Sequence, residues 1–240
     1  FKKNNRFKMK KNIKIFIFAR KNSKGIKNKN LVKLKSKPLI FYSLKIAKQI
    51  VKKDDIYISS DNPLLEKFAF KHGVNFIKRP KYLATSHSPE YLSWKHAINN
   101  LKNRNINFDI FVSLPTTSPL RNKTDVLKTI NKLNKKIDIV LTATKSSRNP
   151  YFNIVEKKKN GFYNTVVKKK NIFNRQDAPL TYDLNTVAFV TTPKYILKSK
   201  SIFDGKVHIN CTPLERSIDI DDKFDLKIAN RLIRKWEEKQ

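Results

Sequence analysis

Short apolar runs alternate with helical patterns along most of the chain. The first run, Ile13–Phe18, is rich in β-branched and aromatic residues and leads into a polar loop, which is typical of a buried strand. Four later runs predict further strands at Ile56–Ser60, Val74–Ile77, Ile110–Leu114 and Ile137–Thr144. Together these runs predict the strands of a central sheet.

Apolar residues at helical spacing fill the intervals between the strands. The expected helices cover Leu39–Ile50, Leu64–His72, Glu90–Leu101, a segment beginning near Thr124 and Asp125, and Phe224–Trp236. This alternation indicates an α/β protein with a mostly parallel sheet between helices. We therefore expect a three-layer α/β/α, Rossmann-like fold, and 240 residues suit a single domain over residues 1–240.

The alternation breaks between residues 146 and 183. Turn signals of the Asn-Pro and Asn-Gly type are interspersed there with two short extended pieces, Tyr151–Val155 and Phe162–Val167. We interpret residues 146–183 as a small β-rich excursion from the main sheet. Because it has no evident core of its own, we expect it to pack against a second subunit and form a homodimer.

Lysine dominates the composition. The net charge is +34 and the pI about 10.2, which would ordinarily suggest nucleic acid or an anionic membrane as a partner. The excess is spread along the whole chain, and an A/T-rich coding sequence would produce it through codon composition. A real electrostatic role is the alternative. Hydrophobic residues, at 39%, are sufficient for a sizeable core.

The single cysteine, Cys211, excludes an internal disulfide and a cysteine-based metal site, and it suits a reducing cytoplasm. No stretch reaches the ~20 apolar residues of a membrane span. We expect residues 1–12 to be a basic N-terminal extension and not a signal peptide, because the next apolar run is short. Met9 is the only methionine in the sequence, so translation is expected to begin there, with residues 1–8 as an upstream extension.

The loop after the first strand carries the most informative chemistry. It gathers cations, small polar groups and one glycine: Arg20, Asn22, Ser23, Lys24, Gly25, Lys27 and Lys29. Open α/β sheets bind ligands at the carboxyl ends of their strands, and backbone N–H groups with Arg and Lys suit the oxygens of a triphosphate. The loop is neither a P-loop nor a Rossmann fingerprint. A lysine-rich turn without a ligand is the alternative.

The same loop resembles that of the acylneuraminate cytidylyltransferases, the CMP-sialic acid or CMP-nonulosonate synthetases, whose pattern is A-R-x-x-S-K-G-x-x-x-K-N. The matching residues are Ala19, Arg20, Ser23, Lys24, Gly25, Lys29 and Asn30. The resemblance implies a nucleotidyltransferase fold that binds CTP through Arg20, Asn22, Ser23, Lys24, Lys29 and Asn30. Enzymes that activate the eight-carbon sugar KDO tend to carry S-x-R-x-P-G-K instead, so the match favours a nine-carbon sugar acid.

Three later motifs extend the resemblance. Arg79-Pro80 implies a nucleotide contact for Arg79, although the acid expected near Ser86 is missing. The run T-S-P-L-R begins at Thr117, and the family's preceding Gln falls on Pro115. The third motif, R-Q-x-x-P followed by Asn, has Thr186 in place of the usual Gly. The sugar-binding residues implied by these motifs are Thr117, Ser118, Arg175, Gln176 and Asn185.

Structural alternatives exist for both sugar-binding regions. The hydroxyls of Thr117 and Ser118, held in a run between two prolines, would form a rigid rim suited to a sugar acid, but the same run would also make a Pro-bounded turn that caps the next helix. The planar guanidinium of Arg175 suits a carboxylate or a phosphate. The alternative interpretation is that Arg175 forms an ion pair on the protein surface.

Two aspartates near the C-terminus complete the pattern. Asp219 and Asp221 alternate with isoleucines, so on a strand both carboxylates would project from one face. Such a pair forms a hard oxygen site for Mg²⁺, with Mn²⁺ as the alternative, and the I-D-I-D string resembles the family's metal-binding aspartates. Asp222 and Asp225 are expected to begin the last helix.

The sequence thus predicts a cytoplasmic enzyme that transfers CMP from CTP to the anomeric hydroxyl of a nonulosonic acid, a nine-carbon sugar acid, and releases pyrophosphate. The expected catalytic residues are Arg20, Lys29, Asp219 and Asp221. The rivals are a CMP-KDO synthetase or another sugar nucleotidyltransferase and, from a different class, a basic nucleic-acid-binding domain. The latter would need exposed aromatics among clustered cations, whereas the aromatics here mostly fall on apolar faces. No membrane partner is expected.

Overall fold

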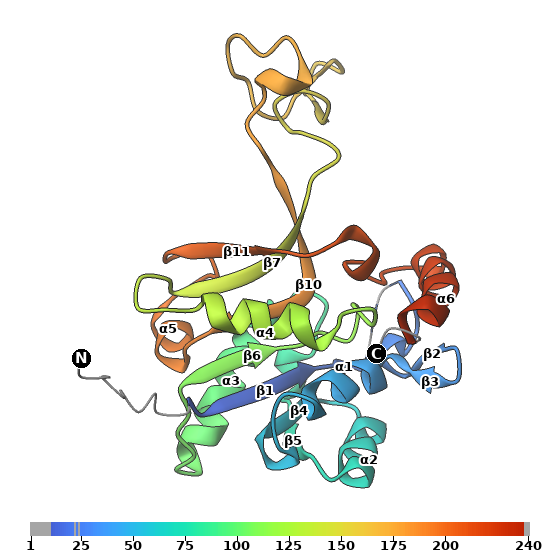
Figure 1. Ribbon diagram of the computed structural model, residues 1–240, viewed down its shortest axis with the longest axis vertical. Helices are drawn as coiled ribbons and strands as arrows, with labels where there is room; N and C mark the ends of the chain where they lie inside the picture. The colour runs from blue at the N-terminus through green and yellow to red at the C-terminus, as the bar shows by residue number, and fades with distance from the viewer. Residues whose placement is uncertain (1–10, 22, 24, 238–240) are drawn as a thin grey trace, which may run out of the picture.

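The computed structural model describes residues 11–21, 23 and 25–237 (Figure 1). This part of the chain folds around a seven-stranded sheet in the order β11-β7-β10-β6-β1-β4-β5. The strands are β1 (Ile13–Phe18), β4 (Ile56–Ser60), β5 (Asn75–Lys78), β6 (Ile110–Ser113), β7 (Ile139–Lys145), β10 (Tyr182–Thr191) and β11 (Val207–Cys211). β10 runs antiparallel to β6 and β7, and the other neighbouring strands are parallel, which confirms the mostly parallel sheet.

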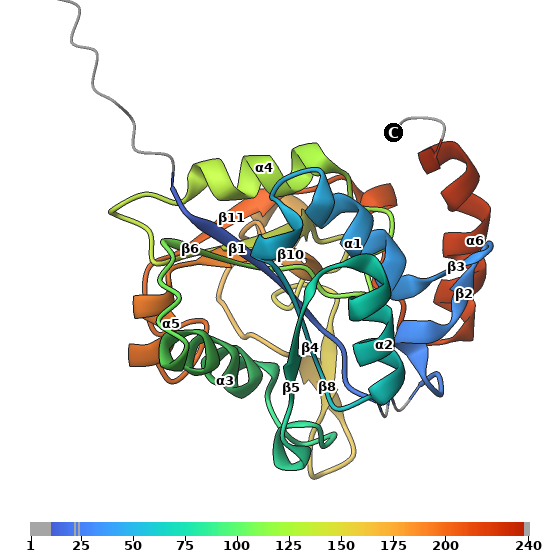
Figure 2. The same ribbon diagram turned by 90° about the horizontal axis from the view of Figure 1, so that it is seen from below.

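Helices cover both faces of the sheet (Figure 2). Residues of α1 (Leu39–Lys48), α2 (Pro63–His72), α4 (Lys123–Lys132) and α6 (Lys223–Glu237) join the core on one face. Residues of α3 (Glu90–Asn103) and α5 (Pro193–Lys198) join the core on the other. The expected three-layer α/β/α fold is confirmed.

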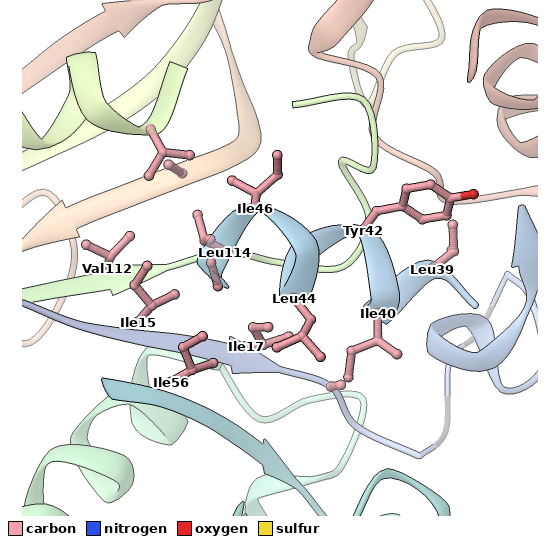
Figure 3. Close-up of a cluster of buried hydrophobic side chains, with 14 of the residues drawn as sticks. Ile15, Ile17, Leu39, Ile40, Tyr42, Leu44, Ile46, Ile56, Val112 and Leu114 are labelled. Carbon is pink, nitrogen blue, oxygen red and sulfur yellow. The ribbon is translucent and has the colours of Figure 1, made fainter. Parts of the chain in front are cut away.

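The central strand β1 supplies both cores because successive side chains of a strand point to opposite faces. Ile15 and Ile17 pack against α1, as Figure 3 shows. Phe16 and Phe18 belong to the opposite core, where Phe18 lies 6.4 Å from the ring of Trp94 in α3. Burial on both faces fixes β1, and the loop that follows it therefore starts from a rigid position.

Three elements between residues 182 and 211 were not predicted from the sequence: β10, α5 and β11. β10 contains a register shift between Asn185 and Phe189, which breaks the alternation that would mark a strand. α5 has six residues, too few for a clear helical period. β11 lies at the edge of the sheet and is largely exposed or half-buried, so it lacks an apolar run.

The excursion leaves the sheet after β7 and returns into β10, projecting from the body of the molecule (Figure 1, top). It contains a small antiparallel sheet of β8 (Val155–Lys157) and β9 (Tyr163–Thr165). The expected extended piece Tyr151–Val155 is wrong at its start, because residues 151–153 form a turn closed by hydrogen bonds to Asn149. At the other end of this approximate range, Tyr182 and Asp183 already pair with β7.

The excursion exposes much apolar surface. Its exposed large side chains are Phe152, Ile154, Val155, Phe162, Tyr163, Val166, Phe173, Leu180 and Tyr182. The expectation that aromatics mostly lie on buried faces therefore does not hold for this segment. Within the described part of the chain, no helix is both long and apolar enough to cross a membrane.

Candidate active site

A cleft of about 580 Å³ lies at the carboxyl ends of β1, β5 and β6. Five chain segments line it: the loop after β1 (residues 20–30, the β1 loop), the segment after β5 (79–93), the turn after β6 (115–117), Thr186 of β10, and Asp219 with Asp221 from the segment before α6 (218–222, the acidic segment). Ligands of open α/β sheets bind at this edge. The cleft therefore brings together motifs from the beginning, middle and end of the chain.

Lys29 joins the β1 loop to the acidic segment. Its Nζ donates hydrogen bonds to the Ile220 carbonyl oxygen at 2.8 Å and to Asp221 Oδ1 at 2.9 Å. The Lys29 side chain is 13% exposed and that of Asp221 is 79% exposed, so the ammonium is held inside the cleft while the carboxylate faces solvent. Half-exposed ion pairs are weak, and a ligand phosphate can compete for this ammonium.

Two other residues of the β1 loop, Arg20 and Asn30, are tied to the cleft walls. Arg20 Nη1 donates to the Thr85 carbonyl at 2.8 Å, which holds the guanidinium between two loops. The buried Asn30 donates to the Arg20 carbonyl at 2.8 Å and accepts from the Thr116 hydroxyl. Arg20, Ser23, Lys29 and Asn30 all line the cleft. Two predicted nucleotide ligands, Asn22 and Lys24, lie outside the described residues.

Arg79, in the segment after β5, forms another part of the cleft wall. Its Nη2 donates to the Ser59 carbonyl at 2.9 Å, and its guanidinium lies 5.7 Å from the centre of the Phe18 ring. Burial lowers the pKa of Arg79, while the negative charges of Glu90 and Asp61 oppose that shift. Arg79 lines the cleft, so a nucleotide bound there could contact its side chain.

Three hydroxyls form a rim at the turn after β6. Thr186 Oγ1 lies 2.9 Å from Thr117 Oγ1 and 2.7 Å from Ser118 Oγ, within hydrogen-bonding distance of both. Thr117 and Thr186 line the cleft, whereas Ser118 is fully buried behind them. Thr186, which stands where the resembling family has Gly, thus supplies a hydroxyl that the sequence motif did not predict.

Arg121 fixes this rim from behind. Its fully buried guanidinium donates to Ser43 Oγ at 2.7 Å, to the Thr186 carbonyl at 2.9 Å and to the Pro115 carbonyl. Burial lowers the pKa of Arg121 to about 9, against the opposing pull of Asp219 and Asp125. The side chain therefore remains charged at neutral pH and holds two parts of the cleft together.

The acidic segment is not a strand, so the prediction that Asp219 and Asp221 project from one strand face is wrong in its premise. Local contacts hold the segment instead. The Ile220 N–H donates to the Thr117 carbonyl at 2.8 Å, and the Asp225 carboxylate accepts from the Asp221 N–H at 2.9 Å. These bonds replace a sheet ladder, and both predicted carboxylates still line the cleft.

A partly buried ion pair anchors the chain just before the acidic segment. Arg216 donates from Nε and Nη2 to both oxygens of Asp125, each at 2.9 Å. Asp125 is 3% exposed and also caps α4 together with Asn122. A bidentate pair has a defined geometry, so the entry to the acidic segment is oriented by a helix of the main body.

Asp219 has the surroundings of a ligand-binding carboxylate. It is half-buried, and its Oδ1 is enclosed without a hydrogen-bond partner among the described residues. Burial raises the pKa of Asp219; the hydroxyl of Thr117 opposes this shift, and the negative charge of Asp221 adds to it. A bound cation would satisfy the orphaned oxygen and offset the repulsion between the two carboxylates.

The donor set fits a divalent cation that is completed by substrate. Among the described residues, no group of three or more His, Cys, Asp or Glu side chains could hold a metal. Mg²⁺ commonly binds to proteins through one or two carboxylates plus substrate phosphates and water. Asp219 and Asp221 provide such a pair beside the cationic β1 loop.

Three predicted sugar ligands lie away from the cleft of their own chain. Asn185 is 5% exposed, and its side chain donates to Thr212 Oγ1 at 2.9 Å behind the cleft wall. Arg175 and Gln176 lie on the projecting excursion, where Arg175 Nη2 donates to the Ser147 carbonyl at 3.3 Å. In one chain, therefore, the side chains of these three residues do not join those of Thr117 and Thr186 at the cleft.

Glu90 is the main cleft residue that the sequence reading missed. It lines the cleft from the first turn of α3, and its Oε1 accepts a hydrogen bond of 3.0 Å from Trp94 Nε1. Glu90 is exposed as a whole residue, whereas its hydrogen bond with Trp94 is partly buried, so its carboxyl group is partly desolvated. This desolvation raises its pKa, and Trp94 and Arg79 oppose the shift. An isolated Glu at a helix start gives no sequence signal for such a position.

Comparison with known proteins agrees with this geometry. The sequence profile of the family described as cytidylyltransferase matches residues 15–210. The chain belongs to this cytidylyltransferase family. It is therefore a nucleotidyltransferase, and the matched range includes the β1 loop, Arg79 and the hydroxyl rim but stops before the acidic segment.

Several curated relatives cover most of this cytidylyltransferase. Post-translational flagellin modification protein B of Campylobacter coli is 31% identical over 91% of this chain and 93% of its own length. CMP-N,N'-diacetyllegionaminic acid synthase of Campylobacter jejuni is 32% identical over 90% of this chain and 93% of its own. N-acylneuraminate cytidylyltransferase of Escherichia coli is 26% identical over 92% of this chain, which spans only 52% of that relative.

Solved structures show the same fold. The structure of CMP:2-keto-3-deoxy-manno-octonic acid synthetase complexed with CTP matches the cytidylyltransferase with a TM-score of 0.66 at 13% identity, covering 93% of this chain and 99% of that one. The 4-diphosphocytidyl-2C-methyl-D-erythritol synthase of Anaerococcus prevotii gives a TM-score of 0.63 at 17% identity, with the same coverages. At these identities the likeness concerns the fold.

Proposed function

We propose that this cytidylyltransferase transfers CMP from CTP to the anomeric hydroxyl of a nonulosonic acid and releases pyrophosphate. The observation that carries the proposal is the single cleft that joins Lys29 and Arg20 with the carboxylates of Asp219 and Asp221 and the hydroxyls of Thr117 and Thr186. Relatives over nearly the full chain, named for legionaminic and N-acylneuraminic acids, support this choice of acceptor.

The residues suggest how the substrates would be arranged. Lys29 and Arg20 lie where they can neutralise the triphosphate, and the rim of Thr117 and Thr186 can accept and donate hydrogen bonds to the hydroxyls and carboxylate of the sugar acid. The sugar oxygen would then face the α-phosphorus. Holding two reactants in line supplies much of the rate in phosphoryl transfer, because little covalent chemistry is left to the protein.

Asp219 and Asp221 would hold a divalent cation, Mg²⁺ or Mn²⁺, with oxygens of the triphosphate. When bound, this ion supplies positive charge against the charge that develops on the phosphoryl oxygens. Lys29, which already contacts Asp221, lies where it can act on the same oxygens. We assign the reaction to the cytoplasm, where a chain with one cysteine stays reduced.

A turnover assay tests the proposal. The enzyme is incubated with each of the four ribonucleoside triphosphates, a panel of neuraminic, legionaminic, pseudaminic and KDO acids, and Mg²⁺, and pyrophosphate is measured. We expect release with CTP and a nine-carbon acid. Turnover with KDO alone would support the KDO-activating alternative, and equal use of all four nucleotides would contradict the assignment.

We further propose that the enzyme is a homodimer joined through the excursion. Its exposed apolar side chains support this, because a protruding segment with so much apolar surface gains stability from a partner. A second copy would also give Arg175 and Gln176 a route to the sugar, by bringing its excursion to the cleft of the neighbouring subunit. Light scattering at micromolar concentration should give about twice the mass of one chain.

A further inference from the structure

One wall of the cleft carries polar groups that have no part in the proposed phosphate, metal or sugar contacts. This α3 wall consists of Arg79, Leu83, Ser86, Ser88, Glu90 and Ser93. The wall consists of the segment after β5 and the start of α3, which covers one face of the sheet, whereas the rim of Thr117 and Thr186 comes from the turn after β6 and from β10. The cleft thus has two differently built parts.

The carboxyl group of Glu90 has a fixed orientation within this wall. Trp94 Nε1 donates to its Oε1 at 3.0 Å. Trp94 is 3% exposed, and its ring lies 5.3 Å from that of Phe111 and 5.5 Å from that of Phe189, so the donor cannot easily move. Because Trp94 engages one oxygen, the other is available to accept a hydrogen bond from a ligand.

The same wall contains buried polar atoms in need of partners. Arg79 Nε, Ser88 Oγ and Ser93 Oγ are enclosed and make no hydrogen bond among the described residues. Buried polar atoms of native proteins nearly always have partners, which points to a ligand with several polar edge atoms. Phe18 and Leu83 add apolar surface to this half of the cleft, as a flat heterocycle requires.

The order of the ligand's parts follows from the proposed function, on which this inference rests. With the triphosphate on the β1 loop and the sugar acid on the Thr117 rim, the nucleoside of CTP falls on the α3 wall. The base of CTP carries an exocyclic amino group, which is a hydrogen-bond donor. Uracil carries a carbonyl oxygen, an acceptor, at the same position.

We propose that the Glu90 carboxylate accepts a hydrogen bond from the exocyclic amino group of cytosine and thereby selects CTP over UTP. A carboxylate pairs with the cytosine amino group but faces the uracil carbonyl acceptor to acceptor. Discrimination of this kind is strong because the wrong base leaves buried polar groups unpaired. The contact also gives the cleft an acid on the segment where the family's usual acid near Ser86 is missing.

The test uses Glu90→Gln, which keeps size and shape. Trp94 still needs an acceptor, so the new amide should turn its oxygen toward Trp94 and its NH₂ toward the base. That arrangement opposes the cytosine amino group and suits the uracil carbonyl. We expect the ratio of kcat/KM for CTP over UTP to fall about tenfold to hundredfold, and the ratio of their Kd values, measured by calorimetry without sugar acid, to fall likewise.

Glu66→Gln, the same change on an exposed residue in the first turn of α2, is the matched control and should leave both ratios unchanged. If Glu90→Gln unfolds, wild-type enzyme is compared on CTP and the triphosphate of 2-pyrimidinone riboside, which has hydrogen in place of the amino group. Equal use of the two overturns the proposal, as does an unchanged CTP to UTP ratio in a folded Glu90→Gln enzyme. Failure of the wild type to bind or use CTP would refute the proposed function instead.

Discussion

Gly25 lies directly against the backbone of Asp221: a Cβ built at position 25 would stand 2.1 Å from the Asp221 carbonyl oxygen. A side chain of any size is therefore excluded at this point of the β1 loop. The contact explains why the glycine of the loop motif is required here, by close approach of two backbones and not by a left-handed conformation. It also makes the position of the acidic segment depend on the β1 loop.

Gly25→Ala should therefore reduce activity through displacement of Asp221. The overlap with backbone atoms must move the two segments apart, and we expect kcat to fall at least about tenfold and stability to fall by roughly 1–3 kcal/mol. Steady-state kinetics and urea unfolding measure both effects. In Gly161→Ala nothing lies within 4 Å of the new Cβ, so only the cost of its positive φ, about 1–2 kcal/mol, should remain, with activity unchanged.

Asp219→Asn and Asp221→Asn should each lower turnover by about two orders of magnitude or more. Either change removes one negative ligand of the proposed cation at constant volume, and the charge stabilisation from a metal amounts to several kcal/mol. Activity is measured across a wide range of Mg²⁺. Near wild-type rates in both variants at saturating Mg²⁺ would rule out this role.

Asp222→Asn is the matched control for those variants. Asp222 Oδ1 accepts from the N–H groups of Phe224 at 2.7 Å and Asp225 at 3.0 Å, so it caps α6 and is not part of the cleft lining. These bonds lower the pKa of Asp222. Asn caps helices about as well as Asp, and this variant should keep most of its activity.

The unliganded Asp219→Asn variant should be more stable than wild type near neutral pH. Because burial raises the folded-state pKa of Asp219 above its unfolded value, its ionised form destabilises the folded protein. That penalty is fully present above the folded pKa and disappears below the unfolded pKa, near ~3.9. Thermal unfolding from neutral to acidic pH should show the advantage shrinking as pH falls; a constant advantage would point to a cause other than ionisation.

Removing apolar surface from the excursion should separate the proposed dimer. Phe162 and Phe173 are 72% and 78% exposed, and replacing both with Ser removes a large part of the apolar surface available to a partner. Light scattering should then report a single-chain mass at micromolar concentration. Phe70→Ser on α2, at a residue 89% exposed, should leave the mass unchanged.

The main sheet could be predicted from sequence because its central strands carry apolar runs rich in β-branched and aromatic residues. The predicted bounds of two strands, Ile13–Phe18 and Ile56–Ser60, agree with the structure to the residue. Both strands are largely buried on both faces, and such strands are rich in apolar residues. β10 was not predicted, because the register shift after Asn185 interrupts the alternation of side chains that is typical of a strand. β11 escaped because an edge strand with one solvated face needs few apolar residues.

The cleft could be anticipated only in part. The β1 loop and the I-D-I-D string are contiguous motifs, so their residues could be named in advance. A hydrogen bond with Trp94 and the packing of α3 position Glu90 at the cleft. Both are tertiary contacts that the sequence alone does not predict. Asn185 matched a motif, but its side chain turns toward Thr212, away from the cleft that its neighbour Thr186 lines.

The excursion joins the sheet through two neighbouring strands, β7 and β10. Lys145 at the end of β7 pairs with Tyr182 at the start of β10, so strand pairing holds the two ends of the excursion side by side. We therefore expect that changes in its length or sequence leave the ladder below, and with it Thr186, in place. A chimera carrying the corresponding segment of a relative would be expected to acquire that relative's assembly preference while keeping the nucleotide chemistry of this chain.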